Sequence, residues 1–128
     1  TTTLVTSLQV GDLGDITMGP SGVTVNHTVN GGINMTRGLT LTGVTHGIAI
    51  KEGTNARMGV ATLTAGTVTV STTSVTANSR IMLTGQNSSG THGELTVSAR
   101  TAGTSFTITS TSALDTRDVA WIIFEPSP

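Results

Sequence analysis

Few side chains in this 128-residue chain are of the types that carry chemistry, and those few are scattered. The three histidines, His27, His46 and His92, lie in turn-like surroundings and are not spaced as metal ligands on one element. Asp12 and Asp15 offer the oxygen ligands that Ca²⁺ prefers, but the rest of a ligand loop is missing around them. We interpret both as turn residues, since Gly and Pro surround them. The sequence therefore predicts no metal site and no cofactor.

Catalytic arrangements are equally weak. A Ser-His-Asp set can be drawn from almost any Ser-rich chain, and no Gly-x-Ser-x-Gly elbow supports one here. Glu52, Glu94 and Glu125 cannot be paired as glycosidase carboxylates from the sequence alone. Enzymes that cleave polysaccharides usually line a long groove with aromatic platforms, whereas aromatic residues make up 2% of this chain. We expect the protein not to be an enzyme.

The composition also excludes classes of partner. Charged residues make up 10% of the chain, against about 25% in an ordinary soluble domain. The net charge is −1, and the six Lys and Arg residues form no run, so we expect no nucleic acid partner. No apolar run approaches the roughly 18 residues of a membrane span. Because the chain has no cysteine, its durability must come from packing or from oligomerisation.

The segment 56–126 has the pattern of strands with one buried face. Val, Ile, Leu and Phe alternate there with Thr and Ser, and Gly, Asn and Asp punctuate the runs as turns. We predict an all-β fold, a small antiparallel sandwich or barrel-like module of about six strands. The expected strands include Val60–Leu63, Thr67–Val70, Ile81–Leu83, Leu95–Val97, Phe106–Ile108 and Val119–Phe124.

The last of these runs differs from the others because it is apolar on both faces, which is typical of a central strand or of an edge strand covered by a neighbour. We predict that Trp121 and Ile123 in this run, together with Phe106 and Ile108, form the core or an interface. Helix is expected to be nearly absent, and Ser112–Asp118 forms either one helical turn or a long turn.

The same segment resembles a carboxy-terminal module of bacteriophage virion proteins, such as tail fibres, head fibres and capsid-decorating proteins. The resemblance rests on the order Ala-Arg-x-Gly, Leu-x-x-Gly-x-x-x-Val, Ser-x-Ile-x-Leu-Thr, Gly-x-Ser-Phe-x-Ile-x-Ser and Val-x-Trp-x-Ile. The matching positions are Gly59, Gly66, Ile81, Leu83, Gly103, Phe106, Ile108 and Trp121. The resemblance implies a virion surface location and a homotrimer, because phage fibres and decorating proteins are usually trimers.

The amino-terminal part has shorter apolar runs and more frequent turn residues than 56–126. We therefore divide the chain into 1–21, 22–53 and 54–128. Residues 1–21 form an arm and a connector; the arm either is a frayed terminus or docks on a neighbouring subunit. The anchors of a docked arm are Leu4, Val5, Leu8 and Val10. The strands expected within 22–53 are too short to be stable alone. They either add a meander to the module or stack with equivalent strands from other copies, and we favour the second arrangement.

These inferences predict a non-enzymatic phage virion protein, first of all a homotrimeric capsid-decorating protein on the virion surface. Its partners are further copies of itself and the major capsid protein or another virion protein. The alternative is a receptor-binding module of a tail fibre, in which loops such as Gly85–Gly93 contact the host cell surface. The brevity of the chain favours decoration.

Overall fold

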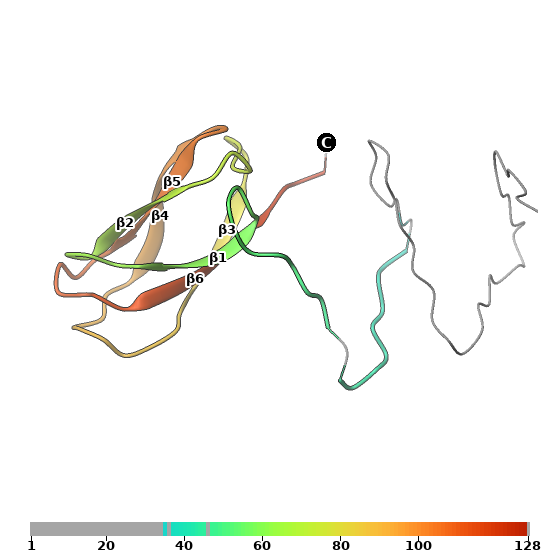
Figure 1. The fold of residues 1–128 in the computed structure, drawn as a ribbon, viewed down its shortest axis with the longest axis horizontal. Coiled ribbons are helices and arrows are strands. Elements are labelled where there is room, and N and C mark those ends of the chain that lie inside the picture. The colour runs from blue at the N-terminus through green and yellow to red at the C-terminus, as the bar shows by residue number, and fades with distance from the viewer. Residues whose placement is uncertain (1–34, 36, 46, 128) are drawn as a thin grey trace, which may run out of the picture. The chain divides into compact units, whose positions relative to one another are not determined.

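The computed structural model describes residues 35, 37–45 and 47–127. The chain divides into two units, Thr1–Leu41 and Thr42–Pro128, and all the strands found belong to the second unit (Figure 1). The fold of this unit is all-β, as the sequence predicts, and no described residue belongs to a helix. It follows that the described residues contain no helix able to cross a membrane.

Each predicted run falls on an observed strand. Alternation of β-branched with polar residues places one face of each strand inside. Only Leu63 lies beyond its strand, by one residue. The strands are β1 (Met58–Thr62), β2 (Thr67–Ser71), β3 (Arg80–Gly85), β4 (Leu95–Thr101), β5 (Ser105–Ser110) and β6 (Asp118–Phe124).

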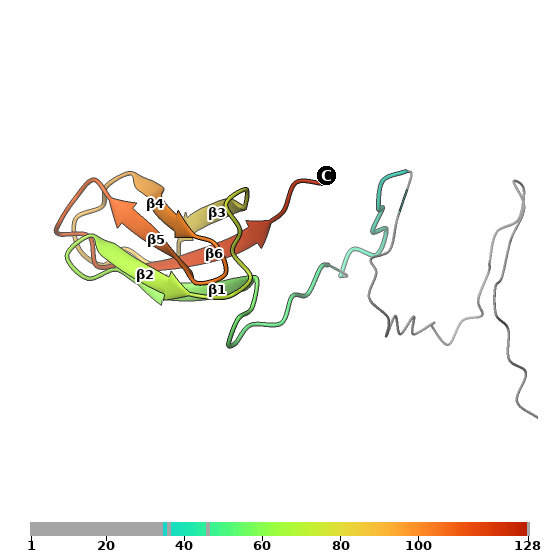
Figure 2. The ribbon, with the colours of Figure 1, turned by 90° about the horizontal axis from the view of Figure 1, so that it is seen from above.

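The strands form two antiparallel three-stranded sheets, with the orders β1-β6-β3 and β2-β5-β4. We call them sheet A and sheet B. They lie as two layers over one core (Figures 1 and 2), so the module is a sandwich. The run Val119–Phe124 lies in β6, the central strand of sheet A, which agrees with its two apolar faces.

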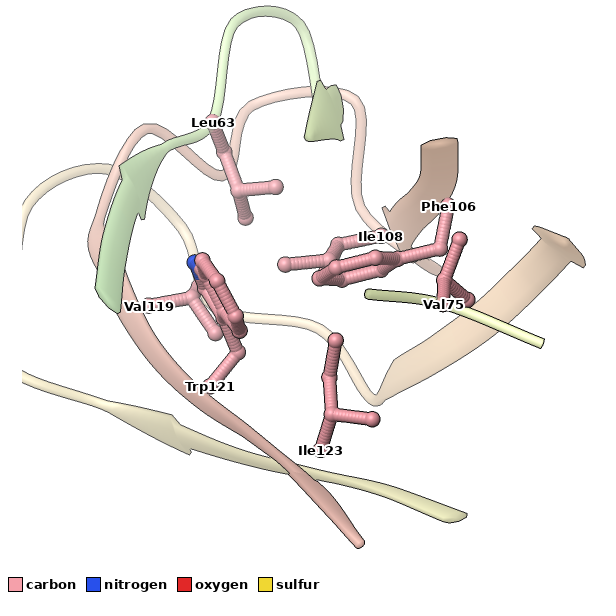
Figure 3. Packing of buried hydrophobic residues seen from close by; sticks show 7 residues of the cluster. All are labelled: Leu63, Val75, Phe106, Ile108, Val119, Trp121 and Ile123. Atoms are coloured by element: carbon pink, nitrogen blue, oxygen red, sulfur yellow. The ribbon is translucent and has the colours of Figure 1, made fainter. Parts of the chain in front are cut away.

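The core fills the space between the two sheets (Figure 3). Its centre is an edge-to-face pair of Phe106 and Trp121, whose ring centroids lie 5.2 Å apart at an interplanar angle of 74°. The indole ring lies over Gly59, the register partner of Trp121 in β1, and a Cβ there would lie 2.8 Å from a ring carbon. The four residues predicted from the sequence all belong to the cluster of buried apolar residues. This cluster contains Leu63, Val75, Phe106, Ile108, Val119, Trp121 and Ile123.

A two-residue turn joins the two sheets. Thr64 and Thr67 exchange backbone hydrogen bonds in both directions, at 3.0 and 3.1 Å. Both central residues have positive φ, 51° at Ala65 and 77° at Gly66, as a type I′ hairpin turn requires. Gly66 is also packed closely, because a Cβ at this position would lie 2.4 Å from the carbonyl oxygen of Ser112.

The described part of the 22–53 region contains no strand. The meander alternative is therefore not formed by residues 35, 37–45 and 47–53, and stacking with other copies stays a prediction. The strands expected here are absent from the described residues because each segment is too short to bury its own apolar residues. Met35, Leu39, Leu41, Val44 and Ile48 are exposed in the single chain.

Candidate interaction surfaces

Several residues considered in the sequence analysis lie outside the described residues: the arm anchors Leu4, Val5, Leu8 and Val10, as well as Asp12, Asp15, His27 and His46. His92 is exposed in the connection between β3 and β4. In the part of the chain that the structure describes, no three His, Cys, Asp or Glu side chains come together as metal ligands.

The first candidate surface is a pair of loops at one end of the sandwich, residues 86–94 between β3 and β4 and residues 111–117 between β5 and β6. We call this pair the loop platform. The loop Gly85–Gly93 proposed from the sequence as a receptor contact belongs to it. Several contacts tie the loops together: Thr91 N–H donates to Leu114 O (3.1 Å), and the hydroxyls of Ser89 and Thr116 lie 2.9 Å apart.

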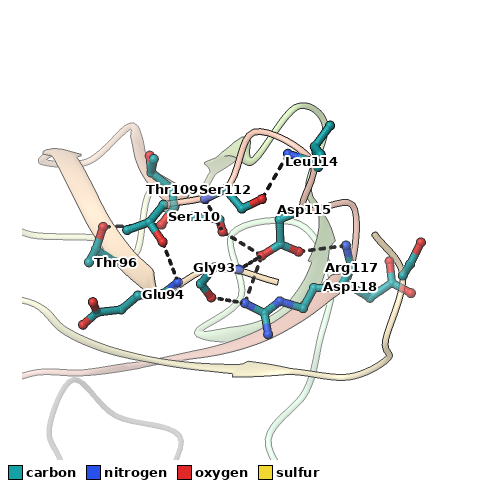
Figure 4. A network of polar contacts seen from close by, with 12 residues as sticks. Gly93, Glu94, Thr96, Thr109, Ser110, Ser112, Leu114, Asp115, Arg117 and Asp118 are labelled. Atoms are coloured by element: carbon teal, nitrogen blue, oxygen red, sulfur yellow. Dashed lines mark hydrogen bonds and ion pairs between the residues drawn. The ribbon is translucent and has the colours of Figure 1, made fainter. Parts of the chain in front are cut away.

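The platform is held from beneath by a buried carboxylate (Figure 4). Asp115 is fully buried. Its Oδ2 accepts hydrogen bonds from the Ser110 hydroxyl (2.7 Å) and the Gly93 N–H (3.1 Å), and lies 2.9 Å from Arg117 Nη2. The same Nη2 donates to Gly93 O at 2.6 Å. One ion pair therefore bridges both loops of the platform.

Burial by itself raises the pKa of Asp115, because it disfavours the charged form. Hydrogen bonds from Ser110, Gly93 and Arg117, together with the Arg117 charge, outweigh burial and lower the pKa from 3.8 to about 2. Asp115 is thus a permanently ionised structural group at neutral pH. A carboxylate that acts as a general acid near neutral pH needs a raised pKa instead.

Another carboxylate, Glu125, has a similar structural role after β6. Hydrogen bonds from the hydroxyls of Ser79 and Thr76 and the nearby Arg57 guanidinium lower its pKa, although burial acts the other way. These contacts fasten the chain after β6 to the turn before β3. Glu52, Glu94 and Glu125, the carboxylates weighed as catalytic groups, have no hydrogen bond to one another among the described residues.

The platform, whose backbone is held by Asp115 and Arg117, presents polar side chains to solvent. The exposed polar residues are Gln86, Asn87, Ser88, Ser89, Thr91, His92, Glu94, Thr111 and Thr116, and the apolar Leu114 is 69% exposed beside them. Rigid loops that expose hydroxyl, amide and imidazole groups suit hydrogen bonding to a hydroxylated or peptide ligand.

The outer faces of the two sheets have opposite chemistry. Sheet B presents Thr and Ser at all its outward positions but Ala99, and several of them are hydrogen bonded to one another, as with Thr69 and Thr107 (3.1 Å) and Ser98 and Thr109 (2.7 Å). Such a face is well hydrated and needs no cover. Its outward residues are Thr67, Thr69, Ser71, Thr96, Ser98, Ala99, Thr101, Ser105, Thr107 and Thr109.

Sheet A presents a second candidate surface, which we call the apolar face. Its register aligns Met58, Ile122 and Met82 in one row across the strands, and Val60, Ala120 and Thr84 in the next. The side chains of Val60, Met82 and Phe124 are 56%, 63% and 49% exposed. The apolar face therefore consists of Met58, Val60, Met82, Ala120, Ile122 and Phe124.

The sequence signalled the apolar face only in part. The run Val119–Phe124 is apolar on both faces, and this pattern fits a covered outer face as well as a central strand. Nothing in the sequence marked Asp115 and Arg117 as a buried pair, because an Asp and an Arg on either side of Thr116 are typical of an exposed turn.

The strand order, the two-layer sandwich and the loop platform define a small all-β module. The model of a protein family, the C-terminal domain of K1 capsule-specific polysaccharide lyase, matches residues 55–124. The match covers more than half of the chain and all six strands, so the chain belongs to this family. This domain is associated with phage tail spikes, which agrees with the predicted relation to phage virion proteins. Among curated proteins, none matches the chain.

Proposed function

We propose that this chain supplies a non-catalytic, homotrimeric β-module of a phage tail spike or tail fibre, and that its loop platform contacts the host cell surface. The observation that carries the proposal is the family match over 55–124, since the matched domain is the C-terminal part of a capsule-specific lyase and such domains are typically non-catalytic. Capsid decoration, the first prediction from the sequence, has no observation of its own in its favour.

The carboxylates of the module support a non-catalytic role. Polysaccharide-cleaving sites need a proton donor or acceptor whose pKa lies near the working pH. Asp115 and Glu125 have lowered pKa values, and their carboxylates accept hydrogen bonds that hold loops in place. Both groups therefore act in holding the module together.

The loop platform supports contact with a saccharide or protein at the cell surface. Its exposed groups are hydroxyls, amides and an imidazole, with the carboxylate of Glu94 and the apolar side chain of Leu114 among them. Hydroxyl-rich ligands are bound by such groups when the loops are already rigid, because little conformational entropy is then lost on binding. The pair Asp115 and Arg117 supplies this rigidity.

A homotrimer is supported by apolar residues that the single chain leaves uncovered. In the described part of the 22–53 region Leu39, Val44 and Ile48 are 58%, 102% and 73% exposed. Large apolar side chains that are left this exposed gain free energy when another chain covers them. The arm anchors Leu4, Val5, Leu8 and Val10 remain proposed contacts to a neighbouring subunit or another virion protein.

Immunogold labelling of phage particles that carry this protein tests the location. An antibody against the full 128-residue chain is expected to label the tail, because the family is that of a tail-spike domain. Labelling spread over the head contradicts the proposal and restores capsid decoration. Particles incubated with antibody that was first absorbed with purified protein serve as the control.

The non-catalytic part of the proposal has its own assay. The purified chain is incubated with capsular polysaccharide, and unsaturated ends are followed by ultraviolet absorbance. We expect no release of unsaturated oligosaccharide, whereas a known capsule lyase under the same conditions gives it. Turnover that persists after removal of contaminants contradicts the proposal.

A further inference from the structure

The two outer faces of the sandwich come from the same Thr-rich sequence, yet only one of them is hydrated. Sheet B carries Thr and Ser at all its outward positions but Ala99, whereas sheet A carries the six residues of the apolar face. A composition rich in Thr offers polar residues for both faces. The apolar face is thus a feature of the fold that the general composition does not explain, and exposed patches of this kind mark contact sites.

The shape of the apolar face includes both a hollow and a projection. A shallow hollow of about 140 Å³ is lined by Met58, Met82, Thr84, Ala120, Trp121 and Ile122. Phe124 stands one outward position beyond Ile122 on β6, and half of its side chain is exposed. An aromatic ring next to an apolar hollow gives one surface both halves of a knob-and-hole contact.

The mainly apolar chemistry of this face favours a second copy over a polar ligand. The six apolar residues surround one polar side chain, Thr84, and the two charges on this side of the sheet lie at its ends: Arg80 is the register partner of Phe124, and Asp118 lies at the other end. A saccharide or nucleic acid on this face would lose hydration and gain few hydrogen bonds. With a net charge of −1, two copies of the chain repel each other little.

We propose that the apolar face of sheet A is the contact surface between copies of this chain. This inference rests on the proposed homotrimer and names the face that forms it. Phe124 of one copy enters the hollow beside Met82 and Ala120 of the next, and the contact repeats around a three-fold axis. Around this axis the Phe124 side of each face meets the hollow side of the next copy, so the two sides of one face contact different copies. Such a contact is heterologous, and it closes into a ring because the rotation between copies is 120°.

Because the chain has no cysteine, an introduced cysteine carries the only thiol, and its labelling rate reports on the burial of that one position. Met82→Cys lies on the apolar face, and Thr69→Cys is the matched control at an exposed outward position of an edge strand in sheet B. Val60→Cys provides a second position on the apolar face. Maleimide labelling of each full-length variant is followed across protein concentration, with native mass spectrometry of the same samples.

If the proposal is right, Met82→Cys and Val60→Cys label about tenfold more slowly once trimers form, while Thr69→Cys labels at one rate throughout. Met82→Lys should also raise the dissociation constant of the assembly about a hundredfold, because it leaves a charge buried without a partner. Thr69→Lys should leave the assembly intact. Near-ultraviolet circular dichroism of Trp121 checks that each variant is folded.

The outcomes separate this inference from the proposed function. Trimers in which Met82→Cys labels as fast as Thr69→Cys overturn the inference and leave the homotrimer standing. Protection of Met82→Cys in a monomer shows that another segment of the same chain covers the face, which also overturns it. Protection only after another virion protein is added identifies a different occupant. The tail location is judged separately by immunogold labelling.

Discussion

Trp121 holds the two sheets together at the level of a single residue. Its ring contacts Phe106 of sheet B and covers Gly59 of sheet A. We expect Trp121→Ala to lower the free energy of unfolding by about 3–5 kcal/mol, since large-to-small changes in a core lose contacts and leave a cavity. Urea unfolding followed by far-ultraviolet circular dichroism measures the change. A variant that unfolds at nearly the parent concentration of urea contradicts a core role.

Ala65 occupies a backbone conformation that its side chain disfavours. A φ of 51° places its Cβ against the neighbouring carbonyl, whereas Asn tolerates this region and is common in type I′ turns. We expect Ala65→Asn to raise the free energy of unfolding by about 0.5–1 kcal/mol. Gly66→Ala is the opposing control, because its new Cβ meets the backbone of Ser112 and should destabilise the protein. If urea unfolding shows Ala65→Asn to be less stable than the parent, the assignment of the turn is wrong.

At the scale of elements, the buried Asp115 determines how the loop platform responds to acid. Its folded pKa is lowered from 3.8 to about 2, so its ionised form is preferred by the folded state. The stability that this preference contributes is fully present above pH 3.8 and is lost as the pH falls toward 2. In the parent protein, thermal melting should therefore decline over this window.

We expect Asp115→Asn to melt well below the parent at pH 7 and to lose part of the decline between pH 4 and 2, about the range set by the two pKa values. Glu94→Gln, a change at an exposed carboxylate of the same platform, is the control and should keep the parent profile. Thermal melts across pH, recorded for the three proteins, provide the test. Identical acid profiles for Asp115→Asn and the parent contradict the structural role of this carboxylate.

The two central strands show how much of the fold can be predicted from the sequence. Strand β6 was predictable as a central strand because Val119–Phe124 is apolar on both faces. Strand β5 is equally central, but its outer residues are Thr and Ser, so it has the pattern of a half-exposed strand. The pairing of β5 with β2 and β4, like that of Asp115 with Gly93, joins positions distant in the chain. Local alternation carries no information on such partners.

At the scale of the whole molecule, the chain joins a module with its own core to segments that leave apolar side chains exposed. The sandwich buries Phe106, Ile108 and Trp121 within one chain. Met35, Leu39 and Ile48 are exposed in the described part of the preceding region, and the apolar face of sheet A is exposed as well. Without cysteine to crosslink it, this chain can gain further stability by covering such surfaces with equivalent chains.

The mass of the native 128-residue chain in solution tests the central claim of a homotrimeric module most directly. Native mass spectrometry at micromolar concentration should give an assembly of three copies, three times 13.0 kDa, and dilution should release single chains without a dimer accumulating. Sedimentation velocity on the same sample provides an independent mass. A folded single chain that persists at every concentration tested contradicts the account.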